Sequence, residues 1–221
     1  MHRIVFPSSE LSVIGVNNGV YQVELLDKKS FLNNEERKYY KSYFSGNFNS
    51  FTLENYKKNN PKKITELIYF PLKKAKETDF VRFSPNEMGL NFLVSQKVIN
   101  LIEQFLLPDY IKIPAKINGF KNNYYTIGFP IITERAINFH KSKFYHRIKK
   151  VELNNLSYED YKEVSGALVK TLSLELVNTN CTKDILNIQG QGLFFSNLLI
   201  SKLKEENIIG FEVGNTTLNL S

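Results

Sequence analysis

The sequence predicts an α+β domain that combines a mostly antiparallel or mixed β-sheet with a few short helices. One observation is a pattern that occurs twice: an apolar run ends at a serine, an amphipathic helix follows, and an apolar strand closes the unit. Ser95 and Ser196 stand at the two helix starts, where a serine hydroxyl can accept a bond from an unpaired amide. The other observation is a series of short alternating or apolar segments bounded by turn residues. At 221 residues, the default is one domain spanning 1–221.

The first 32 residues are predicted to form strands. Residues 4–6 are apolar and short, residues 11–16 are a longer apolar run, and residues 20–26 form a third. Asn17-Asn18-Gly19 lies between the second and third runs. Asparagine and glycine tolerate positive φ, so this tripeptide predicts a β-hairpin.

Residues 33–63 alternate basic and aromatic side chains, with seven basic residues against three acidic ones. One interpretation is a short amphipathic helix, capped by Asn33 or Asn34, whose tyrosines pack inward and whose lysines face water. The other is a binding surface, since cations and aromatic rings together suit single-stranded nucleic acid or a protein partner. The candidate partner-binding residues are Arg37, Tyr39, Tyr40, Tyr43, Tyr56, Lys57 and Lys58. Residues 1–77 thus form a β-rich and basic-aromatic N-terminal part.

The remaining elements follow from apolar periodicity and its interruptions. A helix begins after Ser95 and is ended by Pro108, residues 141–150 are a charged connector, and Ser157 caps a short helix that ends near Gly166. The helix after Ser196 leads to a last strand. Residues 92–94 are an apolar run before Ser95, and the predicted strands are 64–70, 79–83, 110–113, 124–129, 137–139, 172–176, 184–188 and 208–213.

Composition limits the class of protein. Apolar residues make up 42% of the chain, enough for a sizeable core. No apolar run reaches membrane-spanning length and the N-terminus lacks a signal-peptide core, so a cytoplasmic location is expected. The net charge of +7 suits an acidic partner, nucleic acid or solubility. Self-association stays open.

The sequence offers no recognisable catalytic, metal or cofactor site. Its single cysteine, Cys181, has no clear activating environment, and the three histidines are not spaced for a shared metal. Gly190-Gln191-Gly192 lacks the Lys-Ser/Thr that completes a phosphate-binding loop. We therefore expect a non-enzymatic protein without cofactors or metals.

Several short motifs resemble, in order, one known group of proteins. They are Thr78-Asp79-Phe80, residues 92–98, Tyr124-Tyr125, residues 137–144, Asp184-Ile185-Leu186, Phe195-Ser196 and residues 208–211. Together they resemble the immunity proteins of bacterial polymorphic toxin systems, specifically the related families eleven and forty-three, over about residues 78–213. One departure is Asn138, which stands where those families usually have an aspartate before an aromatic residue. If that aspartate caps a turn, asparagine serves almost as well.

The resemblance implies a bacterial protein that binds a cognate toxin and blocks it without catalysis. Such a function in interbacterial competition would use a buried cluster of aromatic and arginine contacts, with charge setting partner choice. The basic-aromatic stretch is the candidate surface. The alternative is a nucleic-acid-binding module that uses Tyr39, Tyr40, Lys57 and Lys58.

Overall fold

The computed structural model describes residues 1–56, 61, 63–164, 168–177 and 182–220. These residues form an α+β fold with fifteen strands in mixed sheets and five short α-helices, as the sequence predicted. The strands are β1 His2–Pro7, β2 Val23–Glu24, β3 Leu67–Pro71, β4 Phe80–Val81, β5 Phe83–Ser84, β6 Phe92–Ser95, β7 Ile111–Ile117, β8 Tyr124–Gly128, β9 Ile131–Ile132, β10 Lys143–His146, β11 Val151–Asn154, β12 Val169–Leu176, β13 Ile185–Ile188, β14 Gly192–Ser196 and β15 Phe211–Leu220. The helices are α1 Leu11–Ile14, α2 Asn34–Phe44, α3 Gln96–Ile102, α4 Tyr158–Val164 and α5 Asn197–Glu205, with 3-10 turns at Phe48–Phe51 and Glu134–Ala136.

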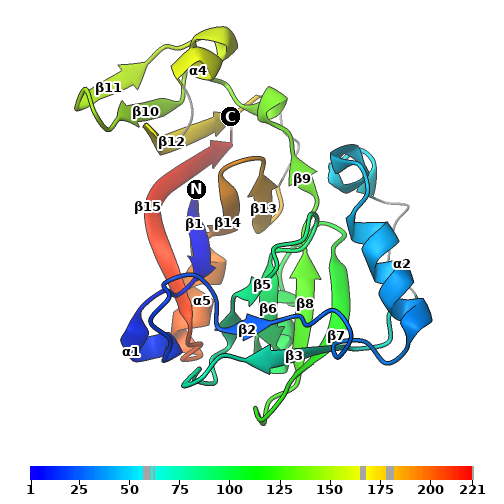
Figure 1. Cartoon of the computed structure of the whole chain (residues 1–221). Coiled ribbons are helices and arrows are strands. Elements are labelled where there is room, and N and C mark those ends of the chain that lie inside the picture. The colour runs from blue at the N-terminus through cyan, green and yellow to red at the C-terminus, as the bar shows by residue number, and fades with distance from the viewer. Residues whose placement is uncertain (57–60, 62, 165–167, 178–181, 221) are drawn as a thin grey trace.

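The strands form two sheets (Figure 1). An eight-stranded sheet has the order β11-β10-β12-β15-β1-β14-β13-β9, and a seven-stranded sheet has the order β4-β6-β8-β7-β3-β2-β5. Most neighbouring strands are antiparallel, but β3 runs parallel to β7 and β12 runs parallel to β15. Each sheet also has a second parallel pair at one end of its order, β2 with β5 in the seven-stranded sheet and β13 with β9 in the eight-stranded sheet.

The two sheets repeat one plan. Six strands of one, β4-β6-β8-β7-β3-β2, correspond in order and in relative direction to β13-β14-β1-β15-β12-β10 of the other. The helices follow the same plan, because α3 and α5 each come directly after the serine-ended strand, and α2 and α4 each come before the parallel strand. We call the first set, with α2 and α3, unit A, and the second set, with α4 and α5, unit B.

The N-terminal strand β1 completes unit B. In unit A the strand beside β7 is β8, which directly follows β7 in the chain. The corresponding strand beside β15 is β1, which comes from the other end of the sequence. The start of β1 pairs with the end of β15, with His2 opposite Leu218. Unit B is therefore a circularly permuted version of the plan of unit A.

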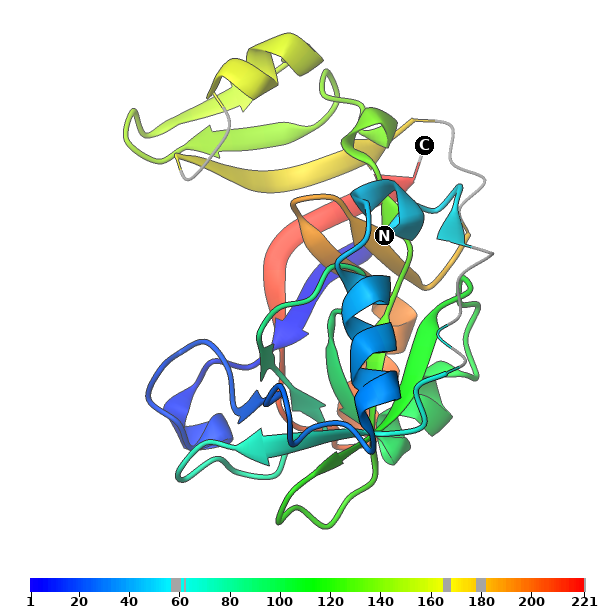
Figure 2. The ribbon, with the colours of Figure 1, turned by 45° about the vertical axis from the view of Figure 1, so that its right-hand side comes forward.

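The core has three apolar clusters arranged around the two sheets (Figure 2). One lies between α2 and the seven-stranded sheet, and another lies between α4 and the eight-stranded sheet. The central cluster joins α3 and α5 with residues of both sheets. Each sheet is thus covered on one face by its own helix and on the other by the shared centre.

Strand periodicity explains how one sheet serves two clusters. On β6, Phe92 and Val94 lie in the central cluster, whereas Leu93 packs on the α2 side. On β14, Phe195 lies in the central cluster and Phe194 packs on the α4 side. Successive side chains of a strand point to opposite faces, so a strand buried on both faces is apolar at every position.

Several expected elements are confirmed. Ser95, Ser196 and Asn33 cap their helices, since each side chain accepts a bond from a first-turn amide. The hydroxyl of Ser157 likewise accepts from the amide of Asp160 at 3.0 Å. The helix after Ser95 is shorter than expected and ends at Ile102 rather than near Pro108.

Two predictions for the N-terminal region are wrong. Residues 11–16 do not form a strand but the single turn of α1, which ends at Gly15 with φ +79°, where a Cβ atom would lie 2.1 Å from the Lys74 carbonyl oxygen. The expected hairpin around residues 17–19 does not form either. Asn18 closes the turn with its own side chain, which accepts from the amides of Val20 and Tyr21, and β2 pairs with β3 and β5 instead.

Two predictions for the middle of the chain also differ. Residues 137–139 form a turn with one bridge to Leu176, in which the Asn138 side-chain oxygen accepts from the amide of Lys141 at 3.2 Å. The Asn138 side chain therefore caps this turn. This is the role expected of Asn138 if the aspartate of the resembled families caps a turn. Residues 141–150 contain the strand β10, because Phe144 and His146 are buried between exposed charges. The predicted helix end at Gly166 falls outside the described residues.

A circular permutant should keep the fold. Opening the exposed turn between Asn17 and Asn18 and joining residue 221 to Met1 through a short glycine–serine linker would place β1 after β15, as β8 follows β7. We expect cooperative urea unfolding, with the same dependence of the free energy of unfolding on urea concentration as in the wild type, because no strand pair is lost. The control opens the chain between Ser201 and Lys202, inside α5, and should abolish cooperative unfolding. A first permutant that fails to fold would contradict the equivalence of β1 and β8.

Candidate functional site

Three residues of the sequence motifs, Asp79, Ser95 and Ile209, meet in a hydrogen-bonded cluster that we call the first clamp. The Ser95 hydroxyl donates to Asp79 Oδ1 at 2.6 Å and accepts from the amide of Val98. The other carboxylate oxygen of Asp79 accepts from the backbone N–H of Ile209 at 3.0 Å. Asp79 and Ser95 belong to unit A and Ile209 follows α5 of unit B, so one carboxylate ties a helix start in one unit to a helix end in the other.

A second clamp repeats these contacts with the units exchanged. The Ser196 hydroxyl donates to Asp184 Oδ1 at 2.6 Å, and Asp184 Oδ2 accepts from the N–H of Leu106 at 2.9 Å. The backbone bonds are also reciprocal, since the amide of Asp79 donates to the Ile209 carbonyl and the amide of Asp184 donates to that of Leu106. Such reciprocity is the property of a two-fold interface between identical subunits. Here one chain supplies both sides.

A tyrosine and a histidine occupy equivalent places beside the clamps. Tyr124 is paired with Ser95 and donates its hydroxyl to the Thr78 carbonyl at 2.8 Å. His2 is paired with Ser196, and its Nε2 lies 2.8 Å from the Lys183 carbonyl, the residue before the second clamp's aspartate. Burial lowers the pKa of His2 below its ordinary value of 6.5. The neutral ring with its proton on Nε2 therefore fits this place.

The clamps are structural rather than catalytic. Ser95 is 2% exposed and Asp79 is buried, and both oxygens of the carboxylate are occupied by donors of the fold. The Ser95 hydroxyl is also engaged on both sides, because it donates to Asp79 and accepts from the amide of Val98. The residues that resemble a family motif thus build the join between the units.

The predicted basic-aromatic surface on α2 is largely part of the core. Tyr40 is 2% exposed and packs against Phe31 and Phe44. Tyr56 is also buried, donates its hydroxyl to the Gly128 carbonyl and accepts from the amide of Ile111. The proposal that Tyr40 and Tyr56 contact a partner therefore needs correction, because both rings fill the space between α2 and the sheet.

The other residues of this predicted surface have different positions. The guanidinium of Arg37 pairs with Asp27, which also binds Lys41, and the two cations lower the pKa of Asp27 to about 2. Tyr39 is half-buried beneath the Lys63 ammonium, and Tyr43 is half-buried among Phe44 and Phe51. Burial raises the pKa of Tyr43 to about 12. Lys57 and Lys58 lie outside the described residues, as does Cys181.

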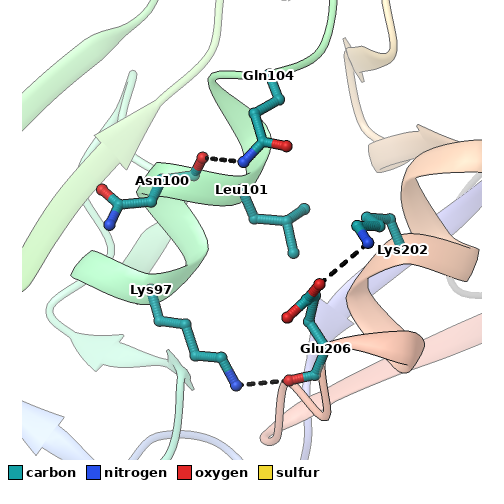
Figure 3. A pocket seen from close by; sticks show the side chains of 6 residues that line it. All are labelled: Lys97, Asn100, Leu101, Gln104, Lys202 and Glu206. Carbon is teal, nitrogen blue, oxygen red and sulfur yellow. Dashed lines mark hydrogen bonds and ion pairs between the residues drawn. The ribbon is translucent and has the colours of Figure 1, made fainter.

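One surface hollow of about 300 Å³ lies between α3 and α5 (Figure 3). Both lysines that line this hollow already contact oxygen atoms of the protein. Lys97 donates to the Glu206 carbonyl at 2.5 Å, and Lys202 lies 3.0 Å from the carboxylate of the same residue. This hollow therefore lacks a free charge with which to recognise an anion.

A second hollow, of about 370 Å³, lies where β12 separates from β15. Arg147 and Lys170 stand in its lining, and neither forms an ion pair with another described residue. The remaining lining residues are Tyr161, Val169, Thr171, Gly190, Gln191 and Thr216. Sequence reasoning assigned Arg147 to a charged connector and missed this site. The adjacent aromatic residues Phe144 and Tyr145 within the charged segment were the signal that could have revealed the strand.

Comparison with known proteins gives no family for this chain. No protein-family model matches the sequence, and no curated protein matches it. Among the described residues, no group of three or more histidine, cysteine or acidic side chains is placed to hold a metal ion. None of the helices in the described part of the chain is long and apolar enough to cross a membrane.

The clamps predict that substitutions of their residues lower the free energy of unfolding by different amounts. Asp79→Ala should lower the free energy of unfolding by about 3 kcal/mol, since it removes two hydrogen bonds to a charged group and strands the N–H of Ile209. Asp184→Ala should cost less, because Asp184 is only partly buried. Ser95→Ala should cost about 1 kcal/mol through the lost cap. Urea unfolding measures all three, with Ser201→Ala as an exposed control expected within about 0.5 kcal/mol of wild type. Equal losses for the two aspartates would contradict the difference in burial.

His2 should make stability depend on pH. Its folded-state pKa is lowered, so the unfolded chain binds a proton more readily, and stability is complete above pH 6.5 and falls as the pH drops through that value. The free energy of unfolding cannot change by more than about 1.4 kcal/mol per pH unit when one proton is bound. Urea unfolding from pH 7.5 to 5 should show this fall in wild type and a smaller one in His2→Phe. The exposed His140→Gln variant should retain the wild-type slope, and an unchanged slope in His2→Phe would contradict the assignment.

Proposed function

We propose that this chain is an immunity protein that binds a cognate bacterial toxin and neutralises it without catalysis. The observation that carries the proposal is the ordered series of motifs between Thr78 and Phe211. The motif residues Asp79, Ser95, Asp184 and Ser196 also hold equivalent places in the two clamps. A scaffold fixed by such contacts supports recognition by a preformed surface.

Neutralisation would occur by direct contact in the cytoplasm of the cell that makes the toxin. A net charge of +7, with cations such as Arg147 and Lys170 outside ion pairs of the described residues, supports a toxin with an acidic face. Of the contacts predicted on α2, Arg37, Tyr39 and Tyr43 keep partial exposure and stay predictions.

The alternative is a nucleic-acid-binding module. Tyr40, one of its two stacking rings, is enclosed in the core and cannot meet a base in the folded chain. Tyr39 is half-buried under Lys63, which leaves one edge for contact. We retain this function only as an outcome of the binding experiment below.

Co-expression with the toxin gene adjacent to this one tests the proposal. The chain should restore growth of cells that make the toxin, and the two purified proteins should form a complex with a dissociation constant in the nanomolar range or tighter, as in preformed inhibitor complexes. Analytical ultracentrifugation gives the stoichiometry and shows whether the chain self-associates alone. Continued killing without a measurable complex would contradict the function. Salt-sensitive binding of a single-stranded oligonucleotide in place of the toxin would favour the alternative.

A further inference from the structure

We infer that an acidic, aliphatic segment of the partner protein docks on a projecting arm of unit B, formed by residues 143–154 and 168–171. This inference rests on the proposed function and names the surface that performs it. The arm comprises β10, β11 and the start of β12, and Figure 1 shows it at the top of the molecule, far from β2 and β3 at the bottom. Both views show it extending beyond the body of the sheets (Figure 2).

The outer strand of the arm, β11, has no counterpart in the plan shared by the two units. In unit A the strand equivalent to β10 is β2, which is followed in its sheet by the parallel strand β5. In unit B the position beyond β10 is taken by β11, which follows β10 through the turn at residues 147–150 and pairs antiparallel with it. No other described strand pairs with β11. The arm therefore ends in an open edge.

One face of the arm is covered and the other is open. On the covered face, Tyr161 of α4 packs against Phe144, with ring centroids 4.8 Å apart. On the open face, Lys170, Tyr145 and Glu152 form a row across three strands, because they are paired in register. Tyr145 is half-buried and both charged residues are exposed. The open face is a polar sheet surface with no covering element among the described residues.

The charge on this face favours an acidic partner. Lys143 and Lys170 are exposed in paired rows whose one acidic residue is Glu152, and Arg147 is exposed in the turn that follows β10. None of the three cations has an ion-pair partner among the described residues, whereas Arg37 and Lys41 on α2 share Asp27. Unpaired cations attract a carboxylate without first losing a partner.

Aliphatic side chains gather at the tip of the same arm. Ile148 is 69% exposed, Val151 is 46% exposed and Leu168 is 44% exposed. They lie near one another, because the amide of Arg147 donates to the Leu168 carbonyl at 2.8 Å and Val151 is paired with His146. Exposed aliphatic residues ringed by cations match a partner segment that has both aliphatic and acidic residues.

The hollow beside β12 lies on the α4 side of the arm, because its lining includes Tyr161 of α4 and Thr171, which is paired with Phe144. It gives a carboxylate side chain of the segment a defined place at this side of the arm. Its floor is ordered by hydrogen bonds from Thr171 to Gln191 at 2.6 Å and from Gln191 to the Tyr161 hydroxyl at 3.3 Å. Arg147 and Lys170 line the same hollow. A carboxylate side chain entering there would meet both cations, and arginine can bind it through two parallel bonds.

The arm suits a protein segment better than a nucleic acid. Single-strand binding surfaces stack successive bases on several aromatic rings. Tyr145 supplies one half-buried ring on the open face, and the exposed apolar side chains at the tip are aliphatic. Aliphatic side chains pack well against leucine or valine but offer no stacking surface to a base.

The experiment compares two charge-reversed variants of the full chain. Arg147→Glu/Lys170→Glu alters the hollow, and Lys73→Glu/Lys121→Glu makes the same change in net charge at exposed residues outside the arm. Ile148→Ser/Leu168→Ser tests the aliphatic tip. The probe is an inactivated form of the protein encoded by the adjacent toxin gene, and calorimetry gives its dissociation constant. Urea unfolding of each variant shows that the fold is kept.

We expect the arm variants to weaken binding at least about tenfold and the control to change it less than about threefold. The charge-reversed arm variant and the control have the same net charge, so a difference between them reports on the position of the charges. Tight wild-type binding that neither arm variant weakens would overturn the docking surface and leave the proposed function standing. Absence of wild-type binding would overturn both. Arm-dependent binding of a single-stranded oligonucleotide, without binding of the toxin, would assign the arm to nucleic acid and overturn the inference.

Discussion

The fold depends on two aspartates that each satisfy a helix start and a helix end belonging to different units. The carboxylate of Asp79 holds the cap of α3 and the backbone after α5, and Asp184 does the converse. A buried carboxylate is tolerated when its oxygens have donors, and here the donors come from both units. Neither unit alone can supply the full set. The central apolar cluster, to which both units contribute, then packs around α3 and α5.

This reciprocal arrangement explains the position of the N-terminal strand. β1 lies between β14 and β15, so the first residues of the chain complete the sheet of its last third. Folding of unit B must therefore bring together residues about as distant in sequence as the chain allows, which is entropically the most expensive loop to close. His2 takes part in this closure twice, because it is paired with Leu218 and its ring nitrogen Nε2 lies 2.8 Å from the Lys183 carbonyl.

The local sequence pattern predicted the helix caps and most strands, since a serine cap needs only the backbone amides that follow it. Sequence reasoning also detected the repeat after Ser95 and Ser196. It could not identify Asp79 as a link between the two units, because the contact from Asp79 to Ile209 spans 130 residues. It likewise offered both interpretations of α2, and burial decides between them: the ring of Tyr40 lies inward, but Lys38 and Lys41 face water. The candidate arm was missed because its charges masked a strand with one buried face.

The buried residues that the two units share support the stability of the fold, and the surface features that differ between the units are available for recognition. Residues that repeat between the units, such as the apolar positions of β6 and β14, are buried and constrained by packing on both faces. The features that differ, above all the strand β11 and the turn before it with Arg147 and Ile148, lie on the surface, whereas Phe144 of the shared strand β10 is buried in the core. Substitution in β11 or this turn changes few buried contacts and costs little stability. A binding protein that must match one partner and reject others can therefore vary its arm while the clamps preserve the fold.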